Sequence, residues 1–212
     1  MRSDMGLEDV TLYNAGETVR TDDGVRPFRV PELVRTHLNE RSQEEYRRPD
    51  GVEIRFVGDG PVEVTLSAEG ECEVTPFWGP FQVQPDGHVT VGEEPTTIEV
   101  SLPERVAAVD RDRLDGRYVD PRVGRLVLFG DPVTIHDVSG DVRPPEPVEL
   151  PDRRLLTYGT SITQGAFASR YPVSYAHATA RRLGMDHVNL GSGGSAFCDG
   201  AIADHIAARG GW

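Results

Sequence analysis

Residues 155–165 have the sequence LLTYGTSITQG, in which a short apolar run ends at a glycine and a serine follows. Leu155 to Tyr158 have the composition of a buried strand, and Gly159 ends it. A serine placed just after such a strand lies outside the carboxyl end of a parallel sheet, where the sites of α/β proteins gather. Ser161 is therefore the first candidate functional residue of the chain.

The chemistry of Ser161 depends on what surrounds its side chain. A serine hydroxyl becomes nucleophilic only when a base takes its proton, so a catalytic Ser161 needs an exposed Oγ and room for a histidine. The backbone N–H groups of the same turn can also stabilise an oxyanion. The alternative is a plain strand-to-helix cap, a position where serine and threonine are favoured for their side-chain oxygen. The stretch alone leaves both interpretations open.

The residues that follow continue the alternation of strand and helix. A helix is predicted from Pro172 to Leu183, and a second strand is predicted over residues 187–190. Asp199 is placed to cap a last helix that runs to Arg209. Strand, helix, strand and helix in this order open a doubly wound parallel α/β layer. The apolar face of the first helix is predicted to be formed by Tyr175, Ala178, Thr179 and Leu183.

A glycine-rich turn ends the second predicted strand. Residues 189–195 have the sequence NLGSGGS, and adjacent parallel strands would place this turn beside Ser161. Glycine lets a backbone N–H approach a ligand closely, as an oxyanion donor must. Ser192 and Ser195 are predicted to be turn residues rather than nucleophiles. Two alternatives remain open: a tight turn without a site, and a phosphate loop of the GxGxxG type, whose acidic ribose partner is expected about 20 residues later.

Together the two stretches resemble the SGNH or GDSL hydrolase family of esterases, lipases and carbohydrate deacetylases. Residues 159–162, GTSI, are similar to the family's nucleophile block, with Thr160 where many members have aspartate. Residues 189–194, NLGSGG, are similar to its second block. The resemblance covers residues 153–212, and the residues before it, 38–56 most closely, resemble the β-sandwich that precedes the hydrolase domain in one branch of the family.

The resemblance implies an esterase or deacetylase that cleaves its substrate by acyl transfer, without a metal or a cofactor. Ser161 would attack the carbonyl carbon, and the N–H groups of Ser161 and Gly194 would hold the oxyanion. The family's oxyanion asparagine and its Asp-x-x-His block match no residue up to Trp212, so the catalytic histidine and aspartate are expected beyond it. The expected substrate is an acylated carbohydrate or a small ester. The alternative function is carbohydrate binding by a sandwich attached to an inactive hydrolase remnant.

Residues 50–140 predict short strands separated by turns that contain glycine and proline. Val52, Ile54 and Phe56 alternate with polar neighbours, as in a strand with one apolar face. Strands at this spacing are typical of a β-sandwich or jelly roll, and only residues 31–45 predict helical turns. Further strands are predicted at residues 62–66, 73–75, 88–91, 97–102, 125–129 and 133–136.

A proline-rich segment divides the two patterns. Residues 143–151, RPPEPVELP, predict a stiff and extended connection. We therefore expect a jelly-roll-like β-sandwich domain over residues 1–150 and the N-terminal part of a three-layer, flavodoxin-like SGNH domain over residues 151–212. Two parallel strands cannot bury both of their faces alone, so we expect uncovered apolar surface on the second part.

The charge of the chain is strongly acidic and unevenly placed. Its 22 basic residues are all arginine, and with 35 acidic residues they give a net charge of −13. Residues 1–150 hold 31 acidic residues and 16 arginines, whereas residues 151–212 hold 4 and 6. Nucleic acids and anionic membranes need a basic face, so neither is expected as a partner. The absence of lysine together with the acid excess is typical of salt-in halophiles; arginine bias from a GC-rich genome is the alternative.

Neither cysteine is expected to bind metal. Cys72 and Cys198 lack a CxxC or CxH context, which predicts two reduced thiols and no zinc site, and Cys198 is expected to pack beneath the glycine-rich turn. No apolar run approaches the ~18 residues of a membrane span. The N-terminus has no apolar segment of a secretory signal, so the expected location is the cytoplasm.

The histidines and aromatic residues give further expectations. Asp204 and His205 are predicted to be a solvent-facing pair, and His177 is predicted to lie on a helix surface. Residues 77–81, FWGPF, would form either a platform that stacks on sugars or a corner of the core, and the second interpretation is favoured.

Overall fold

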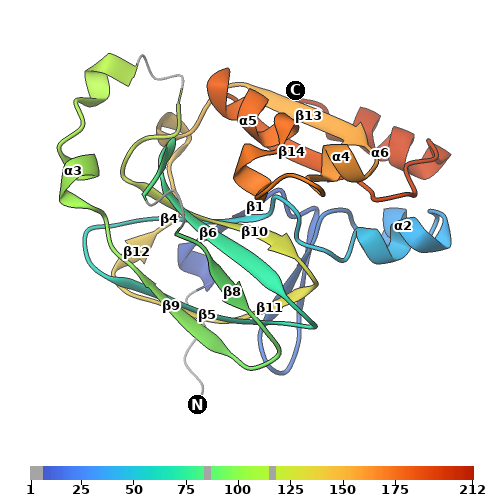
Figure 1. Cartoon of the computed structure of the whole chain (residues 1–212), viewed down its shortest axis with the longest axis horizontal. Helices are drawn as coiled ribbons and strands as arrows, with labels where there is room; N and C mark the ends of the chain where they lie inside the picture. Colours follow the sequence, from blue (N-terminus) through green and yellow to red (C-terminus); the bar gives the residue numbers. More distant parts are fainter. Residues whose placement is uncertain (1–6, 84–86, 115–117) are drawn as a thin grey trace.

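The computed structural model describes residues 7–83, 87–114 and 118–212. Within these ranges the chain forms a β-sandwich and, beside it, a small parallel α/β unit, which lies in the upper right of Figure 1. A β-sandwich followed by a partial SGNH-type α/β unit is the fold class that the sequence predicted, and that prediction is confirmed.

The first sheet of the sandwich is antiparallel, and in the described residues it consists of β1 (Thr11–Tyr13), β4 (Glu53–Gly58), β6 (Cys72–Trp78), β7 (Phe81–Gln82), β8 (Val89–Val91), β10 (Val123–Gly130) and β12 (Val142–Arg143). Its main order is β1-β4-β10-β6-β7, with β12 beside β4 and β8 beside β6. The strands predicted between residues 52 and 129 that belong to this sheet are all present; β6 and β10 are longer than predicted, and β8 is one residue shorter.

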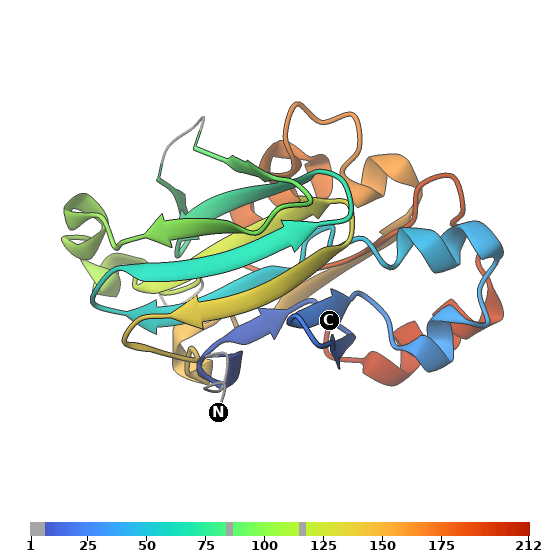
Figure 2. The ribbon, with the colours of Figure 1, turned by 90° about the horizontal axis from the view of Figure 1, so that it is seen from below.

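The second sheet is also antiparallel and consists of β2 (Glu17–Arg20), β3 (Val25–Phe28), β5 (Val62–Ala68), β9 (Thr96–Val100) and β11 (Val133–Ser139). Its order is β2-β3-β11-β5-β9, and Figure 2 shows it in front of the first sheet. Alternating side chains of both sheets fill the space between them, so that Val62, Val64 and Leu66 of β5 are fully buried. Phe56 and Trp78 meet there edge to face, with ring centroids 5.8 Å apart.

The N-terminal region holds elements that the sequence pattern did not predict. Strands β1, β2 and β3 are three or four residues long, too short to show a clear alternation, and Pro27 lies inside β3. The helical turns predicted over residues 31–45 are confirmed as α1 (Glu32–Arg35) and α2 (Glu40–Glu45).

The remaining helices are α3 (Glu104–Ala107), α4 (Ser161–Gln164), α5 (Tyr175–Arg182) and α6 (Gly200–Arg209), with 3₁₀ turns η1 (Leu7–Asp9), η2 (Arg111–Leu114), η3 (Pro147–Glu149) and η4 (Tyr171–Val173). Helices α4, α5 and α6 all belong to the α/β unit. Among the described residues, no helix has the length and apolar character needed to cross a membrane.

The parallel strands of the α/β unit are β13 (Arg154–Gly159) and β14 (Asp186–Gly191). They pair in register, with Gly159 opposite Gly191, so both strands end at the same edge. The predicted order of strand, helix, strand and helix is therefore confirmed.

The expectation of uncovered apolar surface is wrong for β14, because all six of its residues are buried. Val188 and Leu190 pack with Ile202 of α6 and with Leu38 and Tyr46 from the N-terminal part of the chain. Figures 1 and 2 both show the α2 segment lying beside this unit. The N-terminal residues thus provide the cover that two parallel strands cannot provide for themselves.

The buried face of α5 also differs from the prediction. Ala176, His177 and Ala180 are the buried residues of this helix, while Tyr175 is 54% exposed and Leu183, just after it, is 53% exposed. The pattern of apolar residues was misleading because part of the surface against α5 comes from a distant strand: the ring centroid of Phe77 in β6 lies 6.1 Å from that of His177. Tyr171, just before α5, packs with the following side chains of β6 and β10: Phe77, Val127 and Phe129.

A buried ion-pair network joins the sandwich to the α/β unit. Arg55 of β4 donates two hydrogen bonds to Asp186 at the start of β14, of 3.0 and 2.8 Å, and a third of 2.8 Å to Glu53. Arg125 of β10 donates two more to Glu53, of 2.7 and 2.6 Å. Burial alone would raise the pKa of Glu53, but the charges of Arg125 and Arg55 hold it well below its usual range. The polar positions of β4 are therefore buried against the second unit.

The proline-rich segment is partly folded rather than extended throughout. Val142 and Arg143 pair with β4 as β12, and Pro147 to Glu149 form η3. Arg143 holds the Glu149 carboxylate through two hydrogen bonds of 2.8 and 2.7 Å. The division of the chain at residues 150 and 151 stays a proposal.

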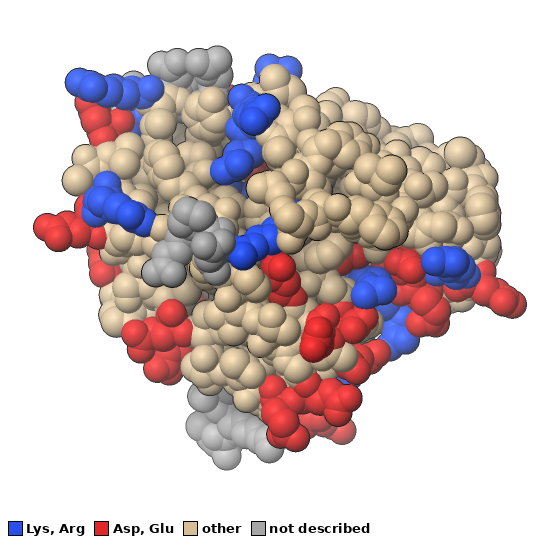
Figure 3. Space-filling model, in the orientation of Figure 1, with Lys and Arg blue, Asp and Glu red and all other residues tan. Residues whose placement is uncertain are grey.

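Charge is distributed as unevenly in space as in the sequence. Figure 3 shows acidic side chains gathered over the sandwich in the lower part of the view, while the surface of the C-terminal unit carries few charged groups. This agrees with the 4 acidic residues and 6 arginines of residues 151–212.

Candidate active site

Ser161 is the first residue of α4 and directly follows β13, with Thr160 at the N-cap position. Its side chain is partly exposed and lines a cavity of about 400 Å³. Because β13 and β14 are parallel and end together, this cavity lies at the carboxyl ends of both strands. We call it the Ser161 cavity.

Both parts of the chain line the Ser161 cavity. The C-terminal part contributes Ser161, Gln164, Ala166, Phe167, Gly193 and Gly194. The N-terminal part contributes Arg41, Glu45, Arg48, Asp50 and Phe129. The structure thus brings Ser161 and Gly194 to one cavity, and it adds a polar wall that the sequence analysis missed. No local motif marks these N-terminal residues, since only the folded chain places them here.

Gly194 has a backbone conformation that favours glycine. Its φ is 66°, in the left-handed region. A Cβ at this position would also lie 2.9–3.2 Å from the guanidinium of Arg41. Gly194 is exposed, so its backbone is open to the cavity.

Gly191 keeps the glycine-rich turn close to α4. A Cβ on Gly191 would lie only 2.3 Å from the backbone nitrogen of Gln164. The end of β14 and the helix that begins with Ser161 therefore pack backbone against backbone. This contact fixes the distance between the two candidate elements of the site.

The α2 segment supports the glycine-rich turn from below. Ser42 Oγ donates a hydrogen bond of 2.9 Å to the carbonyl oxygen of Ser195, and Asn39 Nδ2 donates one of 3.0 Å to the same oxygen. Ser192 Oγ lies 3.2 Å from Ser42 Oγ and 2.7 Å from Ser195 Oγ. Ser192 and Ser195 are buried and hydrogen-bonded within the turn, which confirms that they are turn residues.

Arg29 joins its own segment to two others, residues 45–48 and the end of β14. Its side chain is fully buried. Its Nη1 donates to the Gly191 carbonyl oxygen (2.6 Å), its Nη2 to that of Glu45 (2.6 Å) and its Nε to that of Arg48 (2.8 Å). Asp50 Oδ2 lies 3.8 Å from Nη2 and balances the charge. A buried guanidinium with these acceptors fixes the end of β14 relative to the N-terminal part.

Gln164 of α4 bridges two carboxylates of the cavity wall. Its Nε2 donates a hydrogen bond of 2.8 Å to Glu45 and one of 2.5 Å to Asp50. Asp50 also accepts a hydrogen bond of 2.9 Å from the backbone N–H of Gly130. Burial raises the pKa of Asp50, although Arg29 and these hydrogen bonds act in the opposite direction. The arrangement anchors α4 to the sandwich.

None of the histidines in the described residues lines the Ser161 cavity. The prediction that His177 lies on a helix surface is wrong, because it is 3% exposed and its ring meets that of His187 at 5.9 Å. Burial lowers the pKa of His177 to about 3 and that of His187 to about 4. His187 is also hydrogen-bonded to Thr157 Oγ1 at 2.8 Å. Both rings are therefore neutral at neutral pH.

Two other expectations about single residues need correction. Cys198 is exposed rather than packed beneath the turn, and its backbone N–H donates a hydrogen bond of 3.0 Å to the hydroxyl of Tyr158. His205 is half-buried rather than solvent-facing, and burial lowers its pKa, while Asp204 beside it is exposed.

The aromatic group at residues 77–81 is mainly part of the core. Phe77 and Trp78 are 1% and 2% exposed, while Phe81 is 37% exposed. The interpretation as a corner of the core therefore holds for the first two residues.

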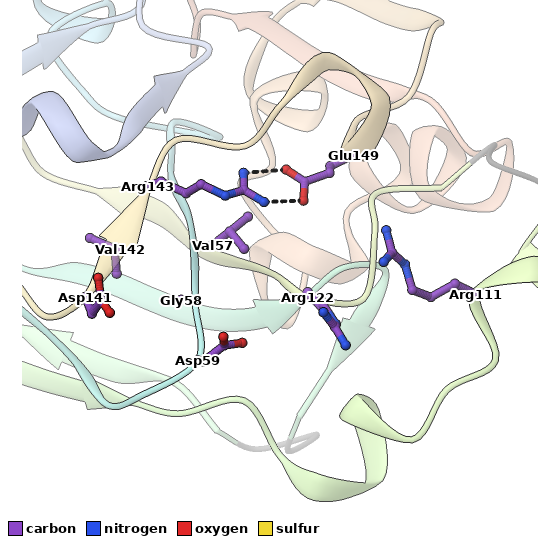
Figure 4. A pocket seen from close by; sticks show the side chains of 9 residues that line it. All are labelled: Val57, Gly58, Asp59, Arg111, Arg122, Asp141, Val142, Arg143 and Glu149. Carbon is purple, nitrogen blue, oxygen red and sulfur yellow. Dashed lines mark hydrogen bonds and ion pairs between the residues drawn. The ribbon is translucent and has the colours of Figure 1, made fainter.

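A second cavity, of about 380 Å³, lies on the sandwich and has a different character (Figure 4). The bidentate pair of Arg143 and Glu149 forms one side of it. Arg111, which also lines it, is paired with Asp120. Its lining residues include arginines and carboxylates but no serine, histidine or cysteine. It therefore lacks the serine or cysteine nucleophile, and the histidine base, of an acyl-transfer site.

The fold, with a candidate nucleophile at the carboxyl ends of two parallel strands, can be compared with known proteins. Residues 152–210 match the model of the GDSL-like lipase/acylhydrolase family. The match is confined to this C-terminal segment. No curated protein sequence matches the chain.

Two solved structures share the fold. A salicylyl-acyltransferase from a tetracycline biosynthetic pathway aligns with a TM-score of 0.64 at 16% identity, over 87% of this chain and 53% of that chain. A structure assigned as a GDSL-like lipase from Bacteroides ovatus aligns with a TM-score of 0.57 at 15% identity, over 93% of this chain and 58% of that chain. The chain therefore spans a little over half the length of each.

Proposed function

We propose that the chain carries the acyl-transfer site of a serine ester hydrolase. Ser161 is the nucleophile, and the backbone N–H groups of Ser161 and Gly194 are the oxyanion donors. The observation that carries the proposal is that both residues line one cavity at the carboxyl ends of β13 and β14. The family match of residues 152–210 supports the same chemistry.

In the proposed reaction, Ser161 Oγ attacks the carbonyl carbon of the ester while its proton passes to a base. The new oxyanion accepts hydrogen bonds from the two backbone N–H groups. Collapse of this intermediate breaks the bond to the alcohol, which leaves with the proton. Water then attacks the acyl-serine in the same way, which releases the carboxylic acid and restores the hydroxyl.

The base is proposed to be a histidine outside residues 1–212. His177 and His187 are unsuited to the role, since their lowered pKa values reflect rings buried away from the cavity. The expected substrate is an acylated carbohydrate or a small ester. The alternative function was carbohydrate binding by an aromatic platform on the sandwich. Phe77 and Trp78 are buried, so their rings are not available to stack on a sugar.

Chemical rescue tests this proposal on the chain itself. Imidazole added to the solution can enter the Ser161 cavity and take the place of the absent base. A fluorophosphonate should then modify Ser161, with a rate at least about tenfold above the rate without imidazole. Peptide mapping by mass spectrometry identifies the modified residue.

Two variants complete the test. Ser161→Ala should remove the modification, and Ser169→Ala, which changes an exposed serine of the following loop, should retain it. If imidazole does not raise the modification of Ser161, or if Ser161→Ala is modified equally, Ser161 is a helix-capping residue and the proposal fails.

A further inference from the structure

Phe167 lies in the loop after α4 and combines two features that cost stability. Its side chain is 90% exposed, although phenylalanine is among the most apolar residues. Its φ is 67°, in the left-handed region, where a bulky side chain crowds the backbone. Gly165, two residues earlier, also has a positive φ, but glycine adopts this conformation without strain, whereas phenylalanine does not.

Neither feature is explained by packing. Phe167 belongs to none of the buried apolar clusters of the described residues, so its conformation is not offset by burial of the ring. Strained backbone of this kind persists where the surrounding structure imposes it, and it gathers at functional sites. Phe167 lines the Ser161 cavity, which connects both features to the candidate site.

Phe167 forms the apolar side of this cavity together with Ala166 and Phe129. Phe129 is a rigid part of this wall, because its ring stacks on Tyr171 with centroids 5.1 Å apart and planes 19° apart. The other side chains of the lining are polar or charged, apart from glycine. The cavity therefore combines an apolar part with Ser161 in its lining.

We propose that Phe167 is a specificity-determining residue that binds an aromatic or bulky apolar acyl group of the ester substrate. The proposal rests on the proposed function of Ser161 and narrows its substrate class. Stacking of an aryl group against an aromatic ring removes apolar surface of both partners from water. Binding of the acyl group would thus bury the ring that is exposed in the free protein.

Two small esters test the proposal by direct binding. Methyl benzoate and methyl acetate share the ester group and differ in the acyl part. Titrations followed by NMR at the backbone amides of Gly193 and Gly194 give the dissociation constants. The unsubstituted chain should bind methyl benzoate at least about tenfold more tightly than methyl acetate.

The variant Phe167→Gly separates binding from stability. It removes the ring and the strain together, so the thermal midpoint should stay equal or rise by up to about 4 °C. The preference for methyl benzoate should fall to within about threefold. Loss of binding without loss of stability is a result that a merely structural role would not give.

Phe197→Gly is the matched control. Phe197 is 70% exposed in the neighbouring loop, has no positive φ and does not line the cavity. This change should lower the thermal midpoint, because glycine adds freedom to the unfolded chain, and should leave the preference for methyl benzoate unchanged.

Either of two results overturns the proposal: equal affinities for both esters in the unsubstituted chain, or an unchanged preference in Phe167→Gly. NMR shifts confined to residues outside the Ser161 cavity would mean that the esters bind elsewhere, and this result also overturns the proposal. Failure of the proposed function looks different, because the preference would persist while imidazole fails to promote modification of Ser161.

Discussion

Arg29 shows how a single residue can connect a candidate site to a distant part of the chain. Its guanidinium donates to carbonyl oxygens of two other segments, residues 45–48 and the end of β14, and Asp50 is the nearby counter-charge. Nothing in the local sequence of Arg29 indicates this role, because its acceptors are backbone atoms as far away as Gly191. Charged side chains with such partners are costly to replace.

Replacement of Arg29 by methionine should lower the free energy of unfolding by about 3 kcal/mol, because Asp50 stays buried without its counter-charge and several carbonyl oxygens lose a donor. Denaturant titration measures the loss. The control Arg47→Met removes an arginine that is 30% exposed and paired on the surface with Glu44 and Glu69. Its effect should stay below about 1 kcal/mol. Equal effects of both variants would contradict the role of Arg29.

His177 should make stability depend on pH. Burial, helped by the nearby His187 and Arg125, lowers its pKa to about 3 in the folded chain, against about 6.5 in the unfolded chain. As pH falls below about 6.5, the unfolded chain binds the proton and the folded chain does not, so stability is lost toward lower pH. Between pH 6.5 and 5 this loss amounts to about 2 kcal/mol.

The variant His177→Phe should remove this part of the pH dependence, since phenylalanine keeps an aromatic ring among Phe77 and Tyr171 and has no proton to bind. Denaturant titrations at the two pH values measure the difference. Parallel losses in the variant and the unsubstituted chain would show that His177 is protonated in the fold.

At the scale of elements, the contact between β14 and α4 rests on Gly191. Gly191→Ala would place a Cβ 2.3 Å from the backbone nitrogen of Gln164, so α4 must move. We expect a loss of about 2 kcal/mol in the free energy of unfolding, together with shifted NMR signals of Ser161. The control Gly200→Ala adds a Cβ with nothing within 4 Å at the start of α6, and it should be neutral or stabilising. A neutral Gly191→Ala would mean that the two elements are loosely packed.

The elements could be predicted where their signal is local. Strand alternation predicted β4, β5 and β10, and the motif stretches predicted that Ser161 and Gly194 lie near each other. The buried face of α5 could not be predicted in full, because part of its contact surface, the ring of Phe77 in β6, lies far away in the sequence. For the same reason, the sequence did not indicate the part of the cavity wall that contains Arg41 and Asp50.

For the whole molecule, the charge of the sandwich leads to a salt prediction. Residues 1–150 carry 31 acidic residues against 16 arginines, and this excess repels itself in dilute buffer. Molar KCl reduces the screening length to about 3 Å, which should relieve the repulsion. The thermal midpoint should therefore be higher in molar KCl than in low salt. A midpoint that stays equal or falls would show that the acid excess is compositional and has no role in halophilic stability.

The two units of the molecule should unfold together, because they share buried contacts. Val188 and Leu190 of the α/β unit share a core with Leu38 and Tyr46, and Arg55 joins Asp186 across the boundary. In a urea titration of a Trp212→Phe variant, Trp78 fluorescence reports on the sandwich core, and the helical CD signal reports mainly on α5 and α6. Both signals should change at one midpoint, as in a two-state transition. An earlier loss of the helical signal would contradict this prediction. It would mean that residues 30–46 do not hold the two parallel strands firmly against the sandwich.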